Sequence, residues 1–288
     1  MRSAEPPELG VIQRVTMDVR NVLKPRMSVL RERWSPVERA KNRRADAFLV
    51  WFPKTGGTWM RIMLSRAMSL HSGHEPADPL TFESFPKADP SLPYLRWLHD
   101  DEPHWKRPEQ LTANKERYRG RKVILLVRDP RDTVVSLYFQ MTRRWKVCRC
   151  TLDEFIRQPR GSIRTMIRYY DIWAEHRNVP ERIELFRYRD VHADPHGSLR
   201  RALDLLGLSA IDDGIVAQAV RDSSFESLRR QELGGVHASS RLRPGRRGDS
   251  ESLKVRRGKV GGYRDYLDEA QIAWIDEQIG SLDAWYGY

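Results

Sequence analysis

The chain has 288 residues, of which 40% are hydrophobic and nine are tryptophan, which excludes a disordered chain and allows a substantial core in one or two domains. The formal net charge of +12 at pH 7 favours anionic ligands, which include nucleic acid, an acidic membrane surface, and sulfated or phosphorylated molecules. Charge alone does not choose among them.

Residues 1–44 are basic, and apolar residues recur at helical spacing from Leu9 to Leu23 until Pro25 interrupts them. Such a helix usually packs on its own domain, although peripheral contact with a membrane is also open. The first residues lack the apolar centre of a signal peptide, and the longest apolar run, 47–52, is too short to cross a bilayer. We therefore expect a soluble, cytoplasmic protein.

The stretch "FLVWFPKTGGTWMRIML" predicts a strand over 47–52, a loop over 53–57 and a helix over 58–71. Backbone N–H groups at the start of such a helix bind anions, and glycines let the ligand approach the backbone closely. Lys54 comes before the glycines, whereas the Walker pattern G-x-x-x-x-G-K-[ST] has its lysine after them. We expect this loop to hold a phosphate-like group through N–H groups, hydroxyls and charge, and the next residue to stack on an adjoining flat ring. The loop residues are Lys54, Thr55, Gly56, Gly57 and Thr58, and the stacking residue is Trp59.

A second buried strand, "KVILLV" at 122–127, is a continuous apolar run typical of parallel sheets. Arg128 follows at the strand end, where open α/β sheets bind ligands. Ser136 lies two turns into the next helix, so its hydroxyl and the Arg128 guanidinium could bind a second phosphate together. A surface ion pair between Arg128 and Asp129 is the alternative.

The two cysteines, Cys148 and Cys150, are separated by one residue. Because a bridge would close a very small ring, we expect no disulfide and a reducing compartment. As metal ligands they lack a second pair, and the H-x-x-H of His71 and His74 lacks a flanking acid, so we expect no metal site.

A third strand is predicted at 182–188, and helices at 164–177 and 268–285. Strands that alternate with helices indicate an α/β fold with a parallel sheet flanked by helices. Residues 234–262 are rich in Gly, Ser and Arg, and we expect this long loop to be mobile until a ligand binds.

Five segments in chain order resemble motifs of the cytosolic sulfotransferase family. "FPKTGGTW" is similar to its 5′-phosphosulfate loop, and "VRDPRDTVVSLY" to its 3′-phosphate element. "FRYRDVHADPHGSLRRALDLLGL", "SSFESLRRQE" and "KVRRGKVGGYRDYLDEAQ" resemble its Tyr-Glu-Asp segment, its adenine-stacking segment and its C-terminal R-K-G motif. The resemblance implies a single sulfotransferase domain over 45–288, with a mainly parallel sheet and a P-loop-kinase-like fold.

The resemblance also implies the donor, 3′-phosphoadenosine 5′-phosphosulfate (PAPS), and the product 3′-phosphoadenosine 5′-phosphate (PAP). Residues 54–58 would bind the 5′-phosphosulfate. Trp59 and Phe225 would enclose the adenine, with Tyr188 near it. The 3′-phosphate would be held by Arg128, Ser136, Arg256, Arg257 and Gly258.

Sulfuryl transfer to an acceptor oxygen or nitrogen proceeds in line, much as phosphoryl transfer does. Lys54 would stabilise the leaving phosphate, and a base must accept the acceptor's proton. His99 in "LRWLHDDEPHW" is the best candidate, oriented by Asp100 or Asp101; His104, His71 and His74 are its rivals.

Three positions depart from the family pattern. Gly57 replaces a threonine of the first loop, and Gly262-Tyr263 replaces an Asp-Trp pair. The lysine that usually precedes the catalytic histidine is absent, and Arg96 could substitute for it.

Two other classes remain open at this point: a P-loop kinase for a nucleoside or sugar, and a non-catalytic module that binds nucleic acid or another anionic surface. The misplaced lysine argues against the first, and the lack of aromatic residues in the basic run 241–257 argues against the second. The acceptor, which could be a small molecule, a lipid or a carbohydrate, and the oligomeric state are not readable.

Overall fold

The computed structural model describes residues 35–235, 239, 242 and 248–288. The predicted helix between Leu9 and Leu23 lies outside these residues, as does part of the predicted loop 234–262, so both stay predictions. Among the described residues, no helix is both long enough and apolar enough to cross a membrane.

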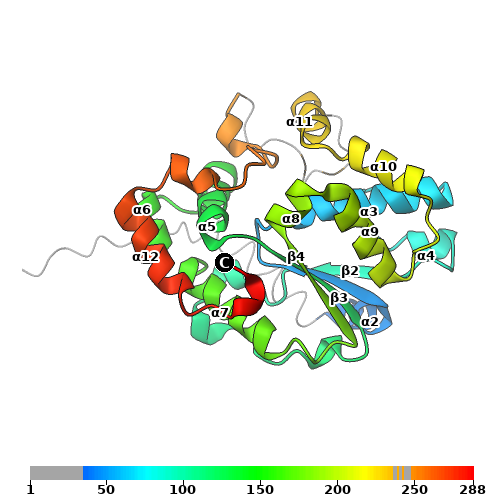
Figure 1. Ribbon diagram of the computed structural model, residues 1–288, viewed down its shortest axis with the longest axis horizontal. Helices are drawn as coiled ribbons and strands as arrows, with labels where there is room; N and C mark the ends of the chain where they lie inside the picture. The colour runs from blue at the N-terminus through cyan, green and yellow to red at the C-terminus, as the bar shows by residue number, and fades with distance from the viewer. Residues whose placement is uncertain (1–34, 236–238, 240–241, 243–247) are drawn as a thin grey trace, which may run out of the picture.

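A parallel sheet lies at the centre, with the strand order β2-β1-β3-β4 (Figure 1). β1 (Ala47–Trp51), β3 (Lys122–Val127) and β4 (Arg182–Arg187) confirm the three predicted strands, and every residue of β1 is buried. β2 (Leu95–Leu98) was not predicted. It is short, and Arg96 interrupts its apolar run, so the sequence carries no strand signal there.

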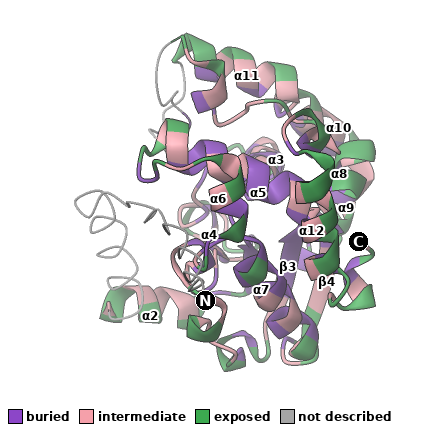
Figure 2. Ribbon diagram, turned by 90° about the vertical axis from the view of Figure 1, so that its left-hand side faces the viewer, coloured by how far each residue is buried: buried purple, intermediate pink, exposed green. Residues whose placement is uncertain are grey.

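The two faces of the sheet are covered by different helices (Figures 1 and 2). Phe48 and Val50 of β1 pack with residues of α5 (Pro130–Phe139), α7 (Ile163–Glu175) and α12 (Glu269–Ile279). Leu49 points the other way, because side chains alternate along a strand, and packs with α3 (Gly57–Ser72), α9 (Pro195–Leu206) and α10 (Asp213–Asp222). This layering confirms the expected α/β fold.

Shorter elements complete the chain. The helices α2 (Pro36–Arg44), α4 (Phe85–Ala88), α6 (Leu152–Arg157), α8 (Tyr188–Ala193) and α11 (Phe225–Gly234) are joined by 3₁₀ turns and by a π-helix at Gln140–Arg144. The helix predicted at 268–285 ends at Ile279, followed by a 3₁₀ turn at Ala284–Tyr286.

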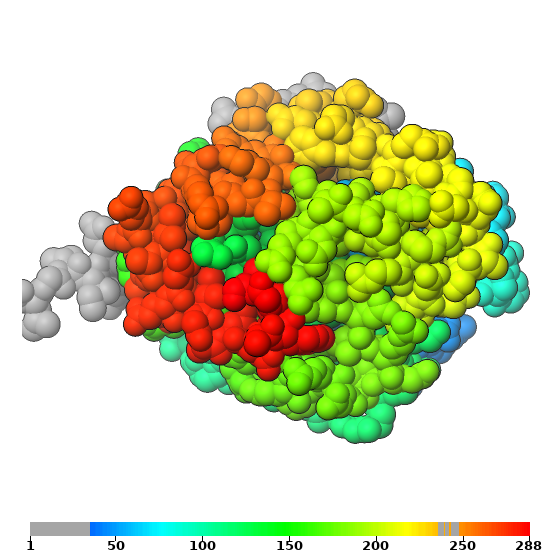
Figure 3. Space-filling view, viewed as in Figure 1, coloured from blue at the N-terminus to red at the C-terminus, as the bar shows by residue number. Residues whose placement is uncertain are grey.

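The segment after residue 250 lies beside α11, as the orange and yellow surfaces of Figure 3 show. The Arg229 guanidinium of α11 donates to the Arg256 carbonyl over 2.8 Å. The Arg128 guanidinium, which follows β3, donates to the Lys259 carbonyl over 2.9 Å. Two distant parts of the chain are thus held together beside the carboxyl end of β3.

Cys148 and Cys150 form a disulfide, so the expectation of no disulfide was wrong and the cysteines do not support a reducing compartment. The chain places their Cα atoms 5.9 Å apart, within the range that a disulfide spans. Two cysteines separated by one residue can therefore form a disulfide when the backbone holds their Cα atoms at this distance.

Candidate active site

The loop between β1 and α3 adopts an unusual backbone conformation. Lys54 has φ 78° and Gly56 has φ 101°, both in the left-handed region. A non-glycine residue held there costs of order 1 kcal/mol, and such strain is concentrated at functional sites. A Cβ at residue 56 would also lie 2.8 Å from the Tyr188 ring, so glycine is required twice over. The first-turn N–H groups of α3 follow directly, as an anion site needs.

Thr55 does not face the ligand side of this loop. Its hydroxyl is buried and donates to the carbonyls of Phe52, at 2.9 Å, and Leu126, at 3.2 Å. The expectation that this hydroxyl donates to a bound anion is therefore corrected: it joins the ends of β1 and β3. Thr58 does line the cavity described below.

The Lys54 ammonium group is held by a residue that the sequence did not reveal. Its Nζ donates to Gln140 Oε1 over 3.1 Å, and Gln140 begins the π-helix after α5. Burial, reinforced by the positive charges of Lys254, Arg144, Arg256 and Arg128, lowers the pKa of Lys54 well below its ordinary value. This cluster of cations is suited to a multiply charged anion.

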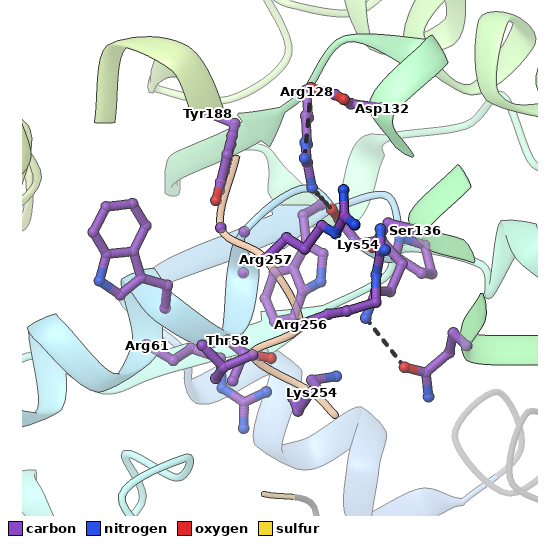
Figure 4. Close-up of a pocket in the computed structure, with 18 of the residues that line it drawn as sticks. Lys54, Thr58, Arg61, Arg128, Asp132, Ser136, Tyr188, Lys254, Arg256 and Arg257 are labelled. Carbon is purple, nitrogen blue, oxygen red and sulfur yellow. Dashed lines mark hydrogen bonds and ion pairs between the residues drawn. The ribbon is translucent and has the colours of Figure 1, made fainter. Parts of the chain in front are cut away.

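A cavity of about 1050 Å³ opens in front of this loop. Most of the predicted donor-site residues line it, from α3, α5, α8, α11 and the segment after residue 250 (Figure 4). They are Lys54, Gly56, Gly57, Thr58, Trp59, Arg128, Ser136, Tyr188, Phe225, Arg256, Arg257 and Gly258. Residues distant in sequence thus surround one space large enough for a nucleotide.

Three of the predicted aromatic residues, Trp59, Tyr188 and Phe225, line the cavity. The Trp59 and Tyr188 ring centroids are 6.2 Å apart, and the Trp59 indole N–H donates to the Ser223 carbonyl over 2.9 Å. Phe225 lies against Gly258, where φ is +60° and a Cβ would overlap the phenyl ring. These contacts fix the rings that could stack on a base.

Arg128 is fixed at the end of β3 by several partners. Its Cζ lies 4.3 Å from the Tyr188 ring centroid, and its Nη2 lies 3.5 Å from Asp132 Oδ2. Asp132, which is buried, accepts the N–H groups of Gly261 at 2.9 Å and Tyr263 at 3.0 Å. Asp132 therefore ties α5 to the segment that carries Arg256 and Arg257.

The structure explains why residue 57 is glycine. A Cβ there would overlap the indole of Trp51, the last residue of β1, which is itself buried. The Trp51 ring stacks on Trp97 at 5.6 Å and meets His99 edge-on at 5.1 Å. An indole therefore occupies the space that a threonine side chain would need.

His99 follows β2, lines the same cavity and has an acidic partner. Its Nδ1 lies 3.3 Å from Glu102 Oε2, and His104 Nδ1 lies 3.6 Å from that same oxygen. Although burial alone would raise it, the pKa of Glu102 falls to about 2 because His99 and His104 stabilise the carboxylate. Burial lowers the pKa of His104 to about 3, so its ring is neutral near pH 7.

Asp100 and Asp101 do not orient His99, contrary to the expectation. Asp100 accepts the Tyr118 hydroxyl at 2.7 Å and pairs with Lys115 at 2.9 Å. Asp101 pairs with Lys106 and accepts the Thr112 N–H at 2.8 Å. Residues 100–102 all have positive φ, and this turn directs Glu102 back toward His99.

Other expected participants lie elsewhere. Arg96 does not replace the missing lysine, since β2 directs it to Glu38, at 2.5 Å, and Glu83, at 3.1 Å, outside the cavity lining. His71 and His74 are likewise not among the cavity-lining residues that the structure describes.

Aromatic rings and cations make up another part of the lining. Trp105 and Trp145 stack at 5.8 Å, and Trp97 lies under the Arg61 guanidinium, whose Cζ is 3.9 Å from its ring centroid. Arg144 pairs with Glu232 at 3.4 Å. The mixture of flat rings and cations suits a ligand with an apolar body.

Comparison with known proteins identifies the family of this chain. A family model for the sulfotransferase domain matches residues 44–282. Cytosolic sulfotransferase 17 of Arabidopsis thaliana is 24% identical over 261 residues, which cover 82% of this chain and 73% of the relative. Flavonol 3-sulfotransferase of Flaveria bidentis is 22% identical over 258 residues, which cover 81% and 80%.

Solved structures also align over most of the chain. Mouse sulfotransferase SULT7A1 complexed with PAP has a TM-score of 0.55 at 23% identity, and the alignment covers 82% of this chain and 83% of that one. Retinol dehydratase in complex with androsterone and inactive cofactor PAP has a TM-score of 0.56 at 15% identity, with 83% and 81% covered. At these identities the likeness concerns the fold.

Proposed function

The chain belongs to the sulfotransferase domain family and is a PAPS-dependent sulfuryl-transfer enzyme; from this premise we propose that Lys54 and His99 carry the reaction and that the acceptor offers a hydroxyl or amine. One observation carries the proposal. Lys54 Nζ and the His99 ring line one cavity, in front of a strained, glycine-containing loop at a helix start.

The donor is assigned to the cation-rich side of the cavity. The 5′-phosphosulfate sits on the N–H groups of Gly57 and Thr58 and beside Lys54, while Arg128, Ser136 and the segment Arg256–Gly258 hold the 3′-phosphate. The adenine lies among Trp59, Tyr188 and Phe225. In support, all these groups border one space, and the positive charges around Lys54 lower its pKa, an effect that a bound anion would offset.

Lys54 acts mainly as charge develops on the leaving group. As the S–O bond to the 5′-phosphate breaks, negative charge grows on the bridging oxygen, and the ammonium group stabilises it. Gln140, at 3.1 Å from Nζ, positions the amine before the donor binds. Because the contribution is made in the transition state, it raises kcat more than donor affinity.

His99 removes the proton from the acceptor while the oxygen or nitrogen attacks sulfur in line. With Nδ1–H donated to Glu102, the ring's Nε2 is the proton acceptor, and Glu102 stabilises the imidazolium that forms. The positive φ values of residues 100–102 support this role, since they place the carboxylate beside the ring.

The acceptor is proposed to be a small molecule, with a lipid or carbohydrate as wider options. The stacked Trp105 and Trp145 rings, together with Trp97, offer flat apolar surfaces. A named relative is a flavonol sulfotransferase, and one structural neighbour contains androsterone, both compatible with a ring-bearing acceptor. We further propose a cytoplasmic location, as for the cytosolic relatives, with no nucleic acid partner.

A thermal-shift titration tests the donor assignment. PAP should raise the melting temperature of the protein, whereas ATP with Mg²⁺ should not, because ATP lacks a 3′-phosphate for Arg128 and Arg257. Stabilisation by ATP with Mg²⁺ and not by PAP would favour a nucleoside or sugar kinase instead. An acceptor panel with labelled PAPS then identifies the substrate class.

A further inference from the structure

Three side chains with metal-binding atoms meet at the acceptor side of the cavity: His99, Glu102 and His104. One ligand atom from each lies within 4.8 Å of those of the other two. All three residues line the cavity, so a ligand there would be reachable from solvent. Two imidazoles and one carboxylate are a donor set that Zn²⁺ and related divalent ions prefer.

The spacing already matches a tetrahedral ion. Zinc ligands at about 2.0–2.2 Å in tetrahedral geometry are separated from one another by about 3.3–3.6 Å. Glu102 Oε2 lies 3.3 Å from His99 Nδ1 and 3.6 Å from His104 Nδ1. The two edges that share the carboxylate therefore need little movement to hold an ion.

A second observation points to a missing ligand. The side chain of His104 is 2% exposed, and among the described residues its Nδ1 has no hydrogen-bond partner. A buried imidazole nitrogen without a partner costs free energy unless something binds it. The turn that carries this cluster is itself anchored, through Asp100 to Tyr118 and Lys115 and through Asp101 to Thr112.

We propose that His99, Glu102 and His104 form a site for a divalent transition-metal ion of the zinc type, with its fourth coordination position open to the acceptor side of the cavity. The site stands on the positions of these three side chains and does not depend on sulfuryl transfer. It is separate from the donor residues, which bind through Lys54, the arginines and backbone N–H groups.

The ion would also affect catalysis, and this consequence rests on the proposed role of His99. A neutral imidazole that ligates a metal through Nδ1 must carry its proton on Nε2. Such a ring cannot accept a proton from the acceptor. A bound ion therefore inhibits turnover while leaving donor binding intact.

Cobalt(II) titration of the full, untagged chain tests the site, since tetrahedral cobalt gives an intense visible band that octahedral aqueous cobalt lacks. We expect a saturable band with one ion per chain, reversed by zinc. A Cys148→Ser/Cys150→Ser background removes the two cysteines as alternative ligands. Glu102→Gln and His104→Ala should each weaken binding by more than about 100-fold, because even outer-shell changes cost roughly 10–100-fold.

His71→Ala, which removes an exposed histidine outside the cavity lining, is the matched control and should bind as the parent does. Absence of a band at millimolar cobalt, or a band that survives Glu102→Gln, would overturn the proposal. If His104→Ala fails to fold, cobalt binding by Glu102→Gln and His99→Ala tests the site instead. Both of these side chains are partly exposed, so we expect these variants to fold.

The effect on turnover is then measured with zinc in the same variants. Inhibition should follow the same concentration dependence as metal binding, with PAP affinity unchanged. Zinc that binds at this cluster but leaves turnover intact would contradict His99 as the base, while the metal site would stand. The two inferences therefore fail by different results.

Discussion

At the scale of single residues, Lys54 combines backbone strain with an unfavourable charge environment. Its φ is 78°, its side chain is partly buried, and desolvation together with neighbouring positive charges lowers the pKa of its amine. A protein holds a lysine in this way when a ligand supplies the compensating negative charge. The donor's phosphosulfate is that charge in our account.

Donor binding should therefore raise the pKa of Lys54 from its lowered value in the free enzyme, with uptake of a proton. The charged amine binds the anion better, so PAP affinity should be highest below the free-enzyme pKa of Lys54 and fall as pH rises through it. Calorimetry at alkaline pH in two buffers of different ionisation enthalpy measures the uptake. Lys54→Arg, which stays charged, should show none; equal binding heats for the parent in both buffers would contradict the prediction.

The histidine proposed as base gives a second prediction at this scale. His99→Ala should lower kcat by about 10²–10⁴-fold, the usual range for a general base, and leave PAP affinity unchanged. Glu102→Gln should lower kcat less, since the ring stays but loses its charged partner. Steady-state kinetics with PAP calorimetry separates the two effects. Near-parent turnover in His99→Ala would place the base elsewhere.

At the scale of elements, α5 and the segment after residue 250 are joined through one carboxylate. Asp132 accepts two backbone N–H groups of that segment and pairs with Arg128. Asp132→Ala should raise the Kd for PAP by about tenfold or more, because hydrogen bonds to a buried charged group contribute roughly 1.5–3 kcal/mol. Glu269→Ala, which removes an exposed carboxylate at the start of α12, is the control and should change Kd much less. Equal effects of the two would remove the anchoring role.

The contact between β1 and α3 gives a prediction about stability. Gly57→Thr should destabilise the protein by about 1–3 kcal/mol through overpacking against Trp51, and should not improve donor binding. Gly280→Ala, whose added Cβ meets only ordinary contacts, should be near neutral. Chemical denaturation measures both. A Trp51→Leu background should recover part of the loss; a fully additive double variant would show that the indole is not the obstacle.

The same elements show how far sequence patterns reach. Continuous apolar runs predicted β1 and β3, and the stretch after β1 predicted a turn followed by α3, because these signals are local. Three features depend on tertiary contacts and carry no local signal. They are β2, whose pairing with β1 defines it; Glu102, which a left-handed turn brings to His99; and Gln140, which meets Lys54 across 86 residues.

At the scale of the whole molecule, the parallel sheet gathers the donor loop, Arg128 and His99 at the carboxyl ends of β1, β3 and β2. The segment after residue 250 then adds Arg256 and Arg257 to the lining of the same cavity. The net charge of +12 favours binding of PAPS, because PAPS is strongly anionic. The fold thus brings the proposed donor site, base and acceptor surface to one cavity.

The most direct test of this account is single-turnover conversion of PAPS to PAP by the parent chain and by Lys54→Met, with a responsive acceptor from the panel. We predict acceptor-dependent PAP formation that falls by at least about 100-fold in the variant, while the Kd for PAP changes by less than about tenfold. Turnover that survives Lys54→Met, or a loss explained entirely by weaker PAP binding, would contradict the central claim.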